Sequence, residues 1–177
     1  MMKNKQYKLV VLVIIFLVFC FIFQLEDENT IILEIDANEK VLLESIIDRY
    51  LDKNIKDNTS NRNFFYQKDG VLTFFEYKLL GIDQSKIYIW LIKADYSNIA
   101  GSINRQNLVS LPFILKYRKN SSNISIIGYA FPRDGMKYGK DIIRLFPRDI
   151  IDVFPQDEEK IILEESLNYK ASEKLNK

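Results

Sequence analysis

The sequence contains no histidine and a single cysteine, Cys20. Without histidine, the chain has no Ser-His-Asp or Cys-His catalytic group, no histidine metal ligand and no histidine pH switch. A single cysteine excludes a disulfide within the chain and any Cys-x-x-Cys metal or redox motif. We therefore expect no metal site, and because no phosphate-binding loop is present either, we expect no cofactor.

The sequence also lacks an excess of either charge, with 25 Lys and Arg against 24 Asp and Glu. Three of the lysines stand in the first 25 residues, which contain no acid, so residues 26–177 carry 22 basic and 24 acidic residues. Nucleic-acid binding requires clustered positive charge, and we expect no nucleic-acid partner. Short basic clusters at 116–119 and 133–148, the second interleaved with Asp134, Asp141 and Asp149, are interpreted as solvated surface.

One long hydrophobic run is present, 15 apolar residues from Leu9 to Phe23, with lysines before it and acids after it. As a helix, residues 7–25 would span about 28 Å, close to a hydrocarbon core of roughly 30 Å. The basic flank predicts a cytoplasmic N-terminus and an exported remainder. A cleaved signal peptide is the alternative, but residues 19–25 are mostly too bulky for cleavage. We predict a basic cytoplasmic segment (1–8), a transmembrane signal-anchor (9–25) and a linker (26–37).

Residues 38–155 have the pattern of an α+β domain. Apolar residues at three- and four-residue spacing predict an amphipathic helix from Asn38 to Ile55, capped by Asp36 or Asn38. We expect this helix to pack on a sheet. The residues predicted to form its apolar stripe are Val41, Leu42, Ile46, Ile47, Tyr50 and Leu51.

Aromatic and β-branched residues then dominate to about residue 131, in strand-length runs separated by turn residues. An Asp-Gly pair predicts a first hairpin, and a Ser/Asn/Gly-rich stretch at 97–107 separates later runs. The runs are almost continuously hydrophobic, so we expect cover on both faces of the sheet, from the 38–55 helix and from the C-terminal segments. The predicted strands are Phe64–Gln67, Val71–Leu80, Lys86–Asp95, Leu108–Arg118 and Ile124–Phe131.

The C-terminal part predicts short helices at 140–146 and 148–154, ended by Pro155, and a charged helical tail over 156–177. The whole pattern predicts an α+β fold in which a helix packs on a curved antiparallel sheet of about four strands, followed by short C-terminal helices. Cystatin-like and NTF2-like domains have this outline, which carries no function by itself.

Residues 131–147, FPRDGMKYGKDIIRLFP, look most like a motif. The Pro, Asp and Gly residues predict a turn, and the aromatic residues of the following helix share one face. We interpret the segment as a folding signature in which the turn and the aromatic anchors fix the helix on the sheet, in preference to a binding site. The candidate interaction or fold-signature residues are Pro132, Asp134, Gly135, Tyr138, Phe146 and Pro147.

Together with Ser110-Leu111-Pro112 in an earlier strand, this segment resembles the end of an uncharacterised small extracytoplasmic α+β domain family of low-GC Gram-positive bacteria. Members of that family are stand-alone membrane-anchored proteins, or are attached to metallopeptidase regulators that resemble beta-lactam sensors. The resemblance covers residues 38–154 and implies a location and a fold, and no activity. The chain departs from the family in having Tyr138 without a preceding aromatic and in its extended C-terminal tail.

Carboxylates are the remaining candidates for acid–base catalysis, and Glu76 is the most interesting of them. In the strand 71–80 it shares a face with Leu72, Phe74, Lys78 and Leu80. Apolar neighbours would raise its pKa, but we favour a solvent-facing Glu76 paired with a cross-strand lysine. We expect no catalytic residue, and an enzyme is the least favoured function.

The sequence favours a single-pass protein of the cell membrane with a non-catalytic extracytoplasmic domain that acts as a binding or sensor module. The alternative is a scaffold subunit of a cell-envelope complex, of the secretion or conjugation kind, which would expose an apolar patch or a sheet edge. The expected partners are the lipid bilayer and a protein of the envelope.

Overall fold

The computed structural model describes residues 36–56, 64, 70–99, 101–120 and 123–175. The predicted cytoplasmic segment, signal-anchor and all of the linker before residue 36 lie outside the described residues, as does most of the Phe64–Gln67 strand with its turn. None of the helices within these ranges is both long and apolar enough to cross a membrane.

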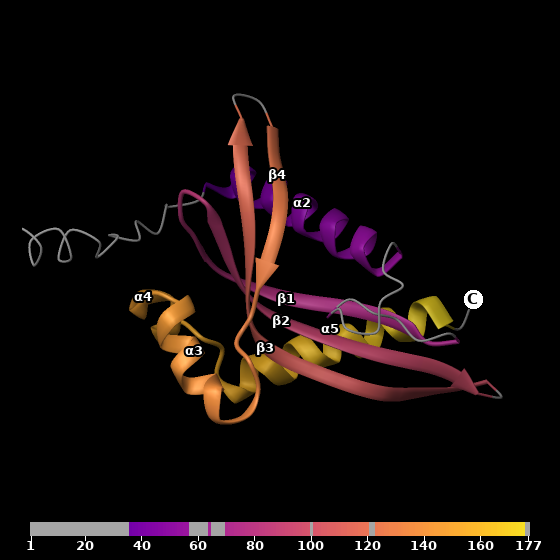
Figure 1. Cartoon of the computed structure of the whole chain (residues 1–177). Coiled ribbons are helices and arrows are strands. Elements are labelled where there is room, and N and C mark those ends of the chain that lie inside the picture. The colour runs from indigo at the N-terminus through magenta and orange to yellow at the C-terminus, as the bar shows by residue number, and fades with distance from the viewer. Residues whose placement is uncertain (1–35, 57–63, 65–69, 100, 121–122, 176–177) are drawn as a thin grey trace, which may run out of the picture. The chain divides into compact units, whose positions relative to one another are not determined.

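Four antiparallel strands form one sheet, and each strand pairs with the next along the chain (Figure 1). They are β1 (Leu72–Ile82), β2 (Lys86–Ile99), β3 (Ser102–Asn120) and β4 (Asn123–Ala130). The predicted α+β class with a four-stranded antiparallel sheet is therefore confirmed. In this order β1 and β4 are the edge strands.

The β2–β3 hairpin is longer than the sequence pattern predicts. Residues 97–107 were expected to separate two strands, but Ile99 pairs with Ser102 and the turn occupies only two residues. Gly101 in this turn has a φ of 81°, a conformation that glycine adopts without steric cost. The hairpin tip is mostly exposed, so its serine and asparagine side chains remain solvated while the backbone ladder continues.

Helix α2 (Ala37–Lys56) confirms the predicted first helix and covers one face of the sheet. Asp36 is its cap, since its Oδ1 accepts hydrogen bonds from the backbone N–H groups of Asn38 and Glu39 at 2.7 and 2.9 Å. The predicted stripe was partly wrong, because Val41 and Leu42 are exposed. The buried face is formed by three residues spaced four apart, Leu43, Ile47 and Leu51.

The opposite face is covered by the C-terminal helices: η1 (Gly135–Lys137), α3 (Tyr138–Leu145), α4 (Arg148–Asp152) and α5 (Asp157–Leu175). Residues 87, 89 and 91 of β2 pack with α2, and residues 88, 90 and 92 pack with Phe146, Ile150 and Leu167 from the C-terminal segments. The expected cover on both faces is thus confirmed, and the sheet is the central layer between α2 and the C-terminal helices.

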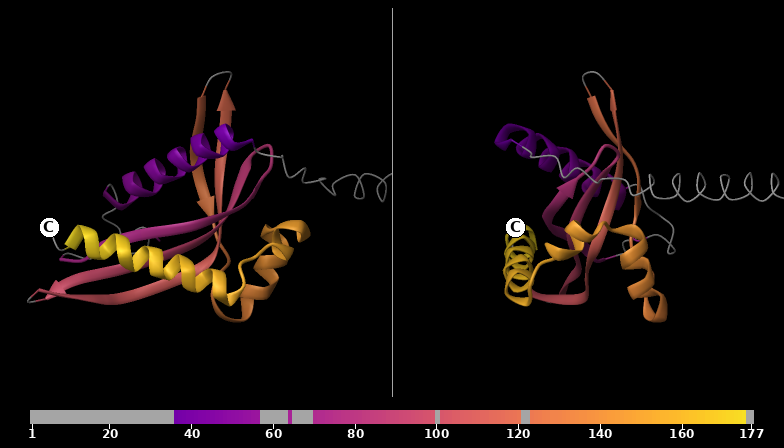
Figure 2. Two further views of the ribbon diagram at one scale, coloured as in Figure 1. Left: turned by 180° about the vertical axis from the view of Figure 1, so that it is seen from behind. Right: turned by 90° about the vertical axis from the view of Figure 1, so that its left-hand side faces the viewer.

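The predicted helical tail is α5, and it is docked on the sheet (Figure 2). Leu167 and Ala171 are fully buried against the sheet. Polar contacts on either side hold the helix: Lys78 Nζ lies 2.6 Å from Glu159 and Arg105 lies 3.2 Å from Glu164. Its apolar residues at four-residue spacing, Leu163, Leu167, Ala171 and Leu175, therefore mark a packed helix and not a solvated extension.

Candidate functional site

The candidate residues of the 131–147 segment do not form one cluster. Gly135 has a φ of 71° in the turn, and Phe146 is buried between the rings of Tyr88 and Phe154. Pro132 is buried and Asp134 is exposed. Pro147 precedes α4, and its carbonyl accepts hydrogen bonds from the backbone N–H groups of Ile150 and Ile151. Tyr138 lies exposed at the start of α3, apart from the buried residues that hold Phe146.

The strongest polar contact of this segment involves Asp141, which we had interpreted as solvated surface. Asp141 is only 2% exposed, because Arg133 closes over it. Its carboxylate accepts the Arg133 backbone N–H at 3.0 Å and the guanidinium Nε and Nη2 at 2.7 and 2.8 Å, and Arg144 lies 3.1 Å away. These hydrogen bonds hold the Asp141 pKa well below its usual range.

The Arg133–Asp141 pair ties the turn to the helix that follows it, which is a structural use of the segment. A bidentate guanidinium–carboxylate pair fixes both orientation and distance. An acid in the first turn of α3, with an arginine eight residues before it, is the sequence signal that points to this pair.

Glu76 is paired, but with a helix and not across the sheet. Its Oε2 lies 2.6 Å from Lys170 Nζ and accepts the Ser166 hydroxyl at 2.9 Å, both from α5. Its cross-strand neighbour is Ile92, so the predicted cross-strand lysine was wrong. Among the described residues, no group of three or more Cys, Asp or Glu is arranged to hold a metal ion.

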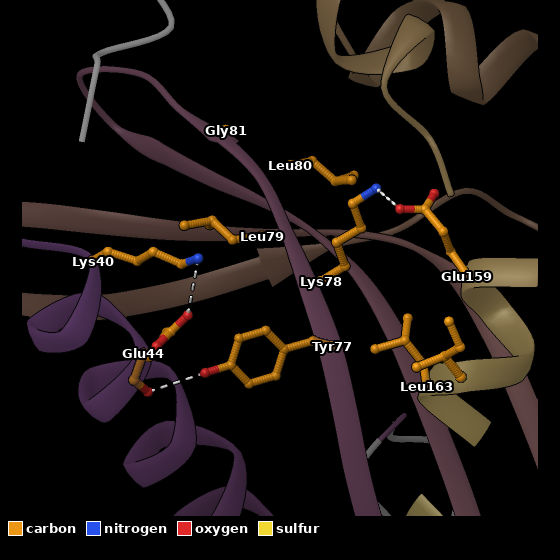
Figure 3. Close-up of a pocket in the computed structure, with 10 residues that line it drawn as sticks. Lys40, Glu44, Tyr77, Lys78, Leu79, Leu80, Gly81, Glu159 and Leu163 are labelled. Carbon is orange, nitrogen blue, oxygen red and sulfur yellow. Dashed lines mark hydrogen bonds and ion pairs between the residues drawn. The ribbon is translucent and has the colours of Figure 1, made fainter. Parts of the chain in front are cut away.

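The most distinctive hollow is lined by residues of β1, α2 and α5 (Figure 3), and we call it the edge cleft. It has a volume of about 570 Å³. β1 forms its floor at the point where a bulge between Leu79 and Gly81 bends the strand. The lining residues are Lys40, Glu44, Tyr77, Lys78, Leu79, Leu80, Gly81, Glu159, Ile162 and Leu163.

The charged groups of the edge cleft are paired within its walls. Lys78 binds Glu159, and Lys40 lies 3.9 Å from Glu44 (Figure 3). The hydrogen bond from Lys78 lowers the Glu159 pKa, so this carboxylate stays ionised. The cleft therefore offers a neutral, largely apolar surface to a ligand.

Tyr77 fixes the α2 wall of the edge cleft. Its hydroxyl donates a 3.2 Å hydrogen bond to the Glu44 carbonyl (Figure 3). Burial, together with the carboxylates of Asp48 and Glu44, raises the Tyr77 pKa well above its usual value. The phenol consequently stays protonated and continues to donate, so the wall does not change with physiological pH.

A second groove runs between α2 and the β3–β4 hairpin, with a volume of about 670 Å³. Lys119 lies 3.7 Å from Glu39 across it. Arg49 and Lys53 of α2 make this groove more basic than the edge cleft. The described lining also includes Leu42, Ile46, Ile124 and Ile126.

Sequence reasoning did not single out either hollow as a site. Tyr77 was placed only within the predicted strand Val71–Leu80, and Lys78 was named only as a neighbour of Glu76. The available signal was the order of the strands. In a sheet of consecutive hairpins the first strand is an edge strand. With one helix on each face of the sheet, that edge lies between the two helices.

Comparison with known proteins found no matching family model, no matching curated protein and no matching solved structure. The geometry of this chain is therefore what indicates its function.

Proposed function

We propose that this chain is a single-pass membrane protein whose α+β domain is a non-catalytic extracytoplasmic binding module, and that the edge cleft binds an extended segment of another envelope protein. The observation that carries the binding part is the position of the cleft, along the side of β1 on which no other strand of the described residues pairs with it. An edge strand presents backbone N–H and C=O groups that an added strand can pair with.

The walls of the cleft limit what can enter. Alternate residues of β1 point to opposite sides: Tyr77 contacts α2, and Lys78 contacts α5. A strand added beside β1 would direct its own side chains alternately toward the two helices. The paired charges of the walls favour a segment with neutral, apolar side chains.

The membrane part of the proposal is supported by the apolar run from Leu9 to Phe23, with its basic and acidic flanks. The resemblance to membrane-anchored extracytoplasmic domains supports the same location. The finer likeness to cystatin-like or NTF2-like folds also belongs to this proposal, since both outlines place a helix across a curved antiparallel sheet.

Site-specific photocrosslinking in cells tests the binding proposal. A photoreactive amino acid at Ile162, which is 64% exposed and lines the cleft, is compared with one at Ile161, which is 55% exposed on the same helix but does not line it. We expect a discrete crosslinked envelope protein from position 162 and none of that product from position 161.

Two outcomes would contradict a segment bound in the cleft. One is the same product at similar yield from both positions. The other is an unchanged yield from position 162 after Leu79→Arg, which places a large charged side chain on the apolar floor. Thermal unfolding of the Leu79→Arg chain provides the folding control.

The scaffold alternative is favoured by a different surface. β4 is the second edge strand, and its Ile127 is a large apolar side chain left exposed. A scaffold would contact permanent neighbours there, so a crosslinker at Ile127 would capture a stoichiometric, co-purifying membrane protein whether or not position 162 captures anything.

A further inference from the structure

The outer surface of η1 and α3 combines exposed apolar side chains with unpaired basic ones. Met136 is 100% exposed and Ile143 is 79% exposed. Both are apolar residues that neither pack in the core nor line the edge cleft. Together with the lysines between them, these two residues form a small amphipathic surface, with apolar side chains next to positive charge.

The spacing places these residues on one side of the helical segment. Met136, Lys140 and Ile143 are separated by four and three residues, the spacing of neighbours on a helix face. The inner side of α3 is occupied by Asp141, which is buried, and by Ile142 and Leu145, which pack against the core. The stripe formed by 136, 140 and 143 is therefore directed outward.

The charge around this stripe is positive, although the chain as a whole is nearly neutral. Residues 133–148 contain five basic residues and two acids. One acid, Asp141, is buried beneath Arg133 and Arg144 and faces inward. Lys137 and Lys140 have no ion-pair partner within the described part of the chain.

We propose that this surface, the α3 patch (Met136, Lys137, Lys140 and Ile143), binds the headgroup region of an anionic phospholipid bilayer. The proposal rests on the proposed membrane anchor. Ten residues lie between the predicted signal-anchor and the Asp36 cap of α2. Even fully extended, ten residues reach only about 35 Å. An anchored domain is therefore tethered close enough to the bilayer for its surface to touch the headgroups.

The chemistry of the patch fits an interface and not a hydrocarbon core. Exposed apolar side chains enter the boundary between headgroups and acyl chains, while lysines extend toward phosphates. The attraction depends on anionic lipid and is screened by salt. Such a contact would fix the orientation of the domain on the membrane.

Fluorescence of the full chain in nanodiscs tests this proposal. The native cysteine is removed (Cys20→Ser), and an environment-sensitive fluorophore is attached at Ile143→Cys or, as a control, at Tyr169→Cys, which is exposed in the last turns of α5. The discs contain either phosphatidylcholine alone or phosphatidylcholine with phosphatidylglycerol. We expect a blue-shifted emission only at position 143 and only with phosphatidylglycerol.

Charge reversal and salt provide the second arm. The double variant Lys137→Glu/Lys140→Glu changes two exposed side chains, so its circular dichroism should match that of the parent chain. We expect it to lose the shift at position 143. Raising the salt to about 1 M, where the screening length is about 3 Å, should also abolish the shift.

Each remaining outcome overturns the α3 patch. Equal shifts in the two lipids, equal shifts at positions 143 and 169, or a shift unaffected by charge reversal would exclude charge-directed binding there. A chain retained in discs without any shift would exclude the patch and keep the anchor. A chain retained in neither kind of nanodisc would contradict the anchor. In that case the labelled chain is mixed with phosphatidylglycerol vesicles. The absence of a blue shift at position 143 in the vesicles would exclude the patch as well.

Discussion

At the scale of single residues, Asp141 carries the main polar contact of the C-terminal segment. A carboxylate removed from water must regain its lost hydration through hydrogen bonds and opposite charge. Three hydrogen bonds from Arg133 and the nearby Arg144 provide both. Because the partners come from the turn before α3 and from α3 itself, the pair fixes the angle at which the chain leaves β4.

We predict that Asp141→Asn destabilises the domain at neutral pH and that its effect shrinks in acid. The folded-state pKa of Asp141 lies below its unfolded value of about 3.9, so the pair stabilises fully above that pH and is lost as the pH falls toward the folded-state pKa. Urea unfolding of both chains at neutral pH and at a series of pH values below about 4 measures the gap, which should be largest at neutral pH and shrink progressively as the pH falls.

Asp152→Asn is the matched control, because Asp152 is an exposed acid at the end of α4. It should leave stability nearly unchanged at both pH values. A gap between wild type and Asp141→Asn that stays constant or widens in acid would show that the ionised pair is not what stabilises this turn.

At the scale of elements, α5 stabilises the sheet although few of its residues are buried. Only two of its 19 residues, Leu167 and Ala171, are buried. Contacts from Glu76, Lys78 and Arg105 to α5 then hold its flanks against β1 and β3. Partly exposed ion pairs each contribute little, so the apolar contact carries most of the energy.

We predict that Leu167→Ala costs about 2–5 kcal/mol in the free energy of unfolding, because Leu167 is fully buried and the truncation leaves a cavity. The control on the same helix is Ile161→Ala, an exposed position where the change should be within about 0.5 kcal/mol. Denaturant titration followed by circular dichroism measures both. Similar small effects for the two variants would mean that α5 does not stabilise the sheet.

The elements also show which sequence signals were sufficient. The 3.6-residue period placed the helix at 38–55 within one residue of α2 at each end, but it did not orient the helix. Val41 and Leu42 are as apolar as Leu43, and the sheet contact selected the series 43, 47 and 51. Likewise, the polar composition of 97–107 hid a hairpin whose backbone pairing does not depend on apolar side chains.

At the scale of the whole molecule, the α+β class and the antiparallel order could be predicted because they follow from consecutive turn-separated runs. The edge cleft could not, since it depends on where two helices distant in sequence lie beside β1. Asp141 was missed although its partners, Arg133 and Arg144, lie close to it in the sequence, because an acid among basic residues is also the pattern of a solvated surface.

We predict that the full chain sediments with membranes and is released by detergent but not by high salt, because an apolar helix of about 19 residues is retained by the hydrocarbon core. Protease added to intact cells should digest the 36–177 domain and spare an N-terminal epitope tag. Recovery of the intact chain in the soluble fraction without detergent, or protection of the domain in intact cells, would contradict the proposed topology.

The neighbour-to-neighbour sheet has a consequence for the order of assembly. Each hairpin can close as soon as its second strand is available, so the strands can collapse while the polypeptide is still being synthesised or exported. One face of β2, formed by Tyr88, Trp90 and Ile92, is nevertheless buried only when the C-terminal helices have formed. The residues that cover it, Phe146, Ile150 and Leu167, come more than 50 residues later in the chain. During that interval the nascent protein exposes an aromatic surface, which favours aggregation or chaperone binding until the C-terminal helices dock.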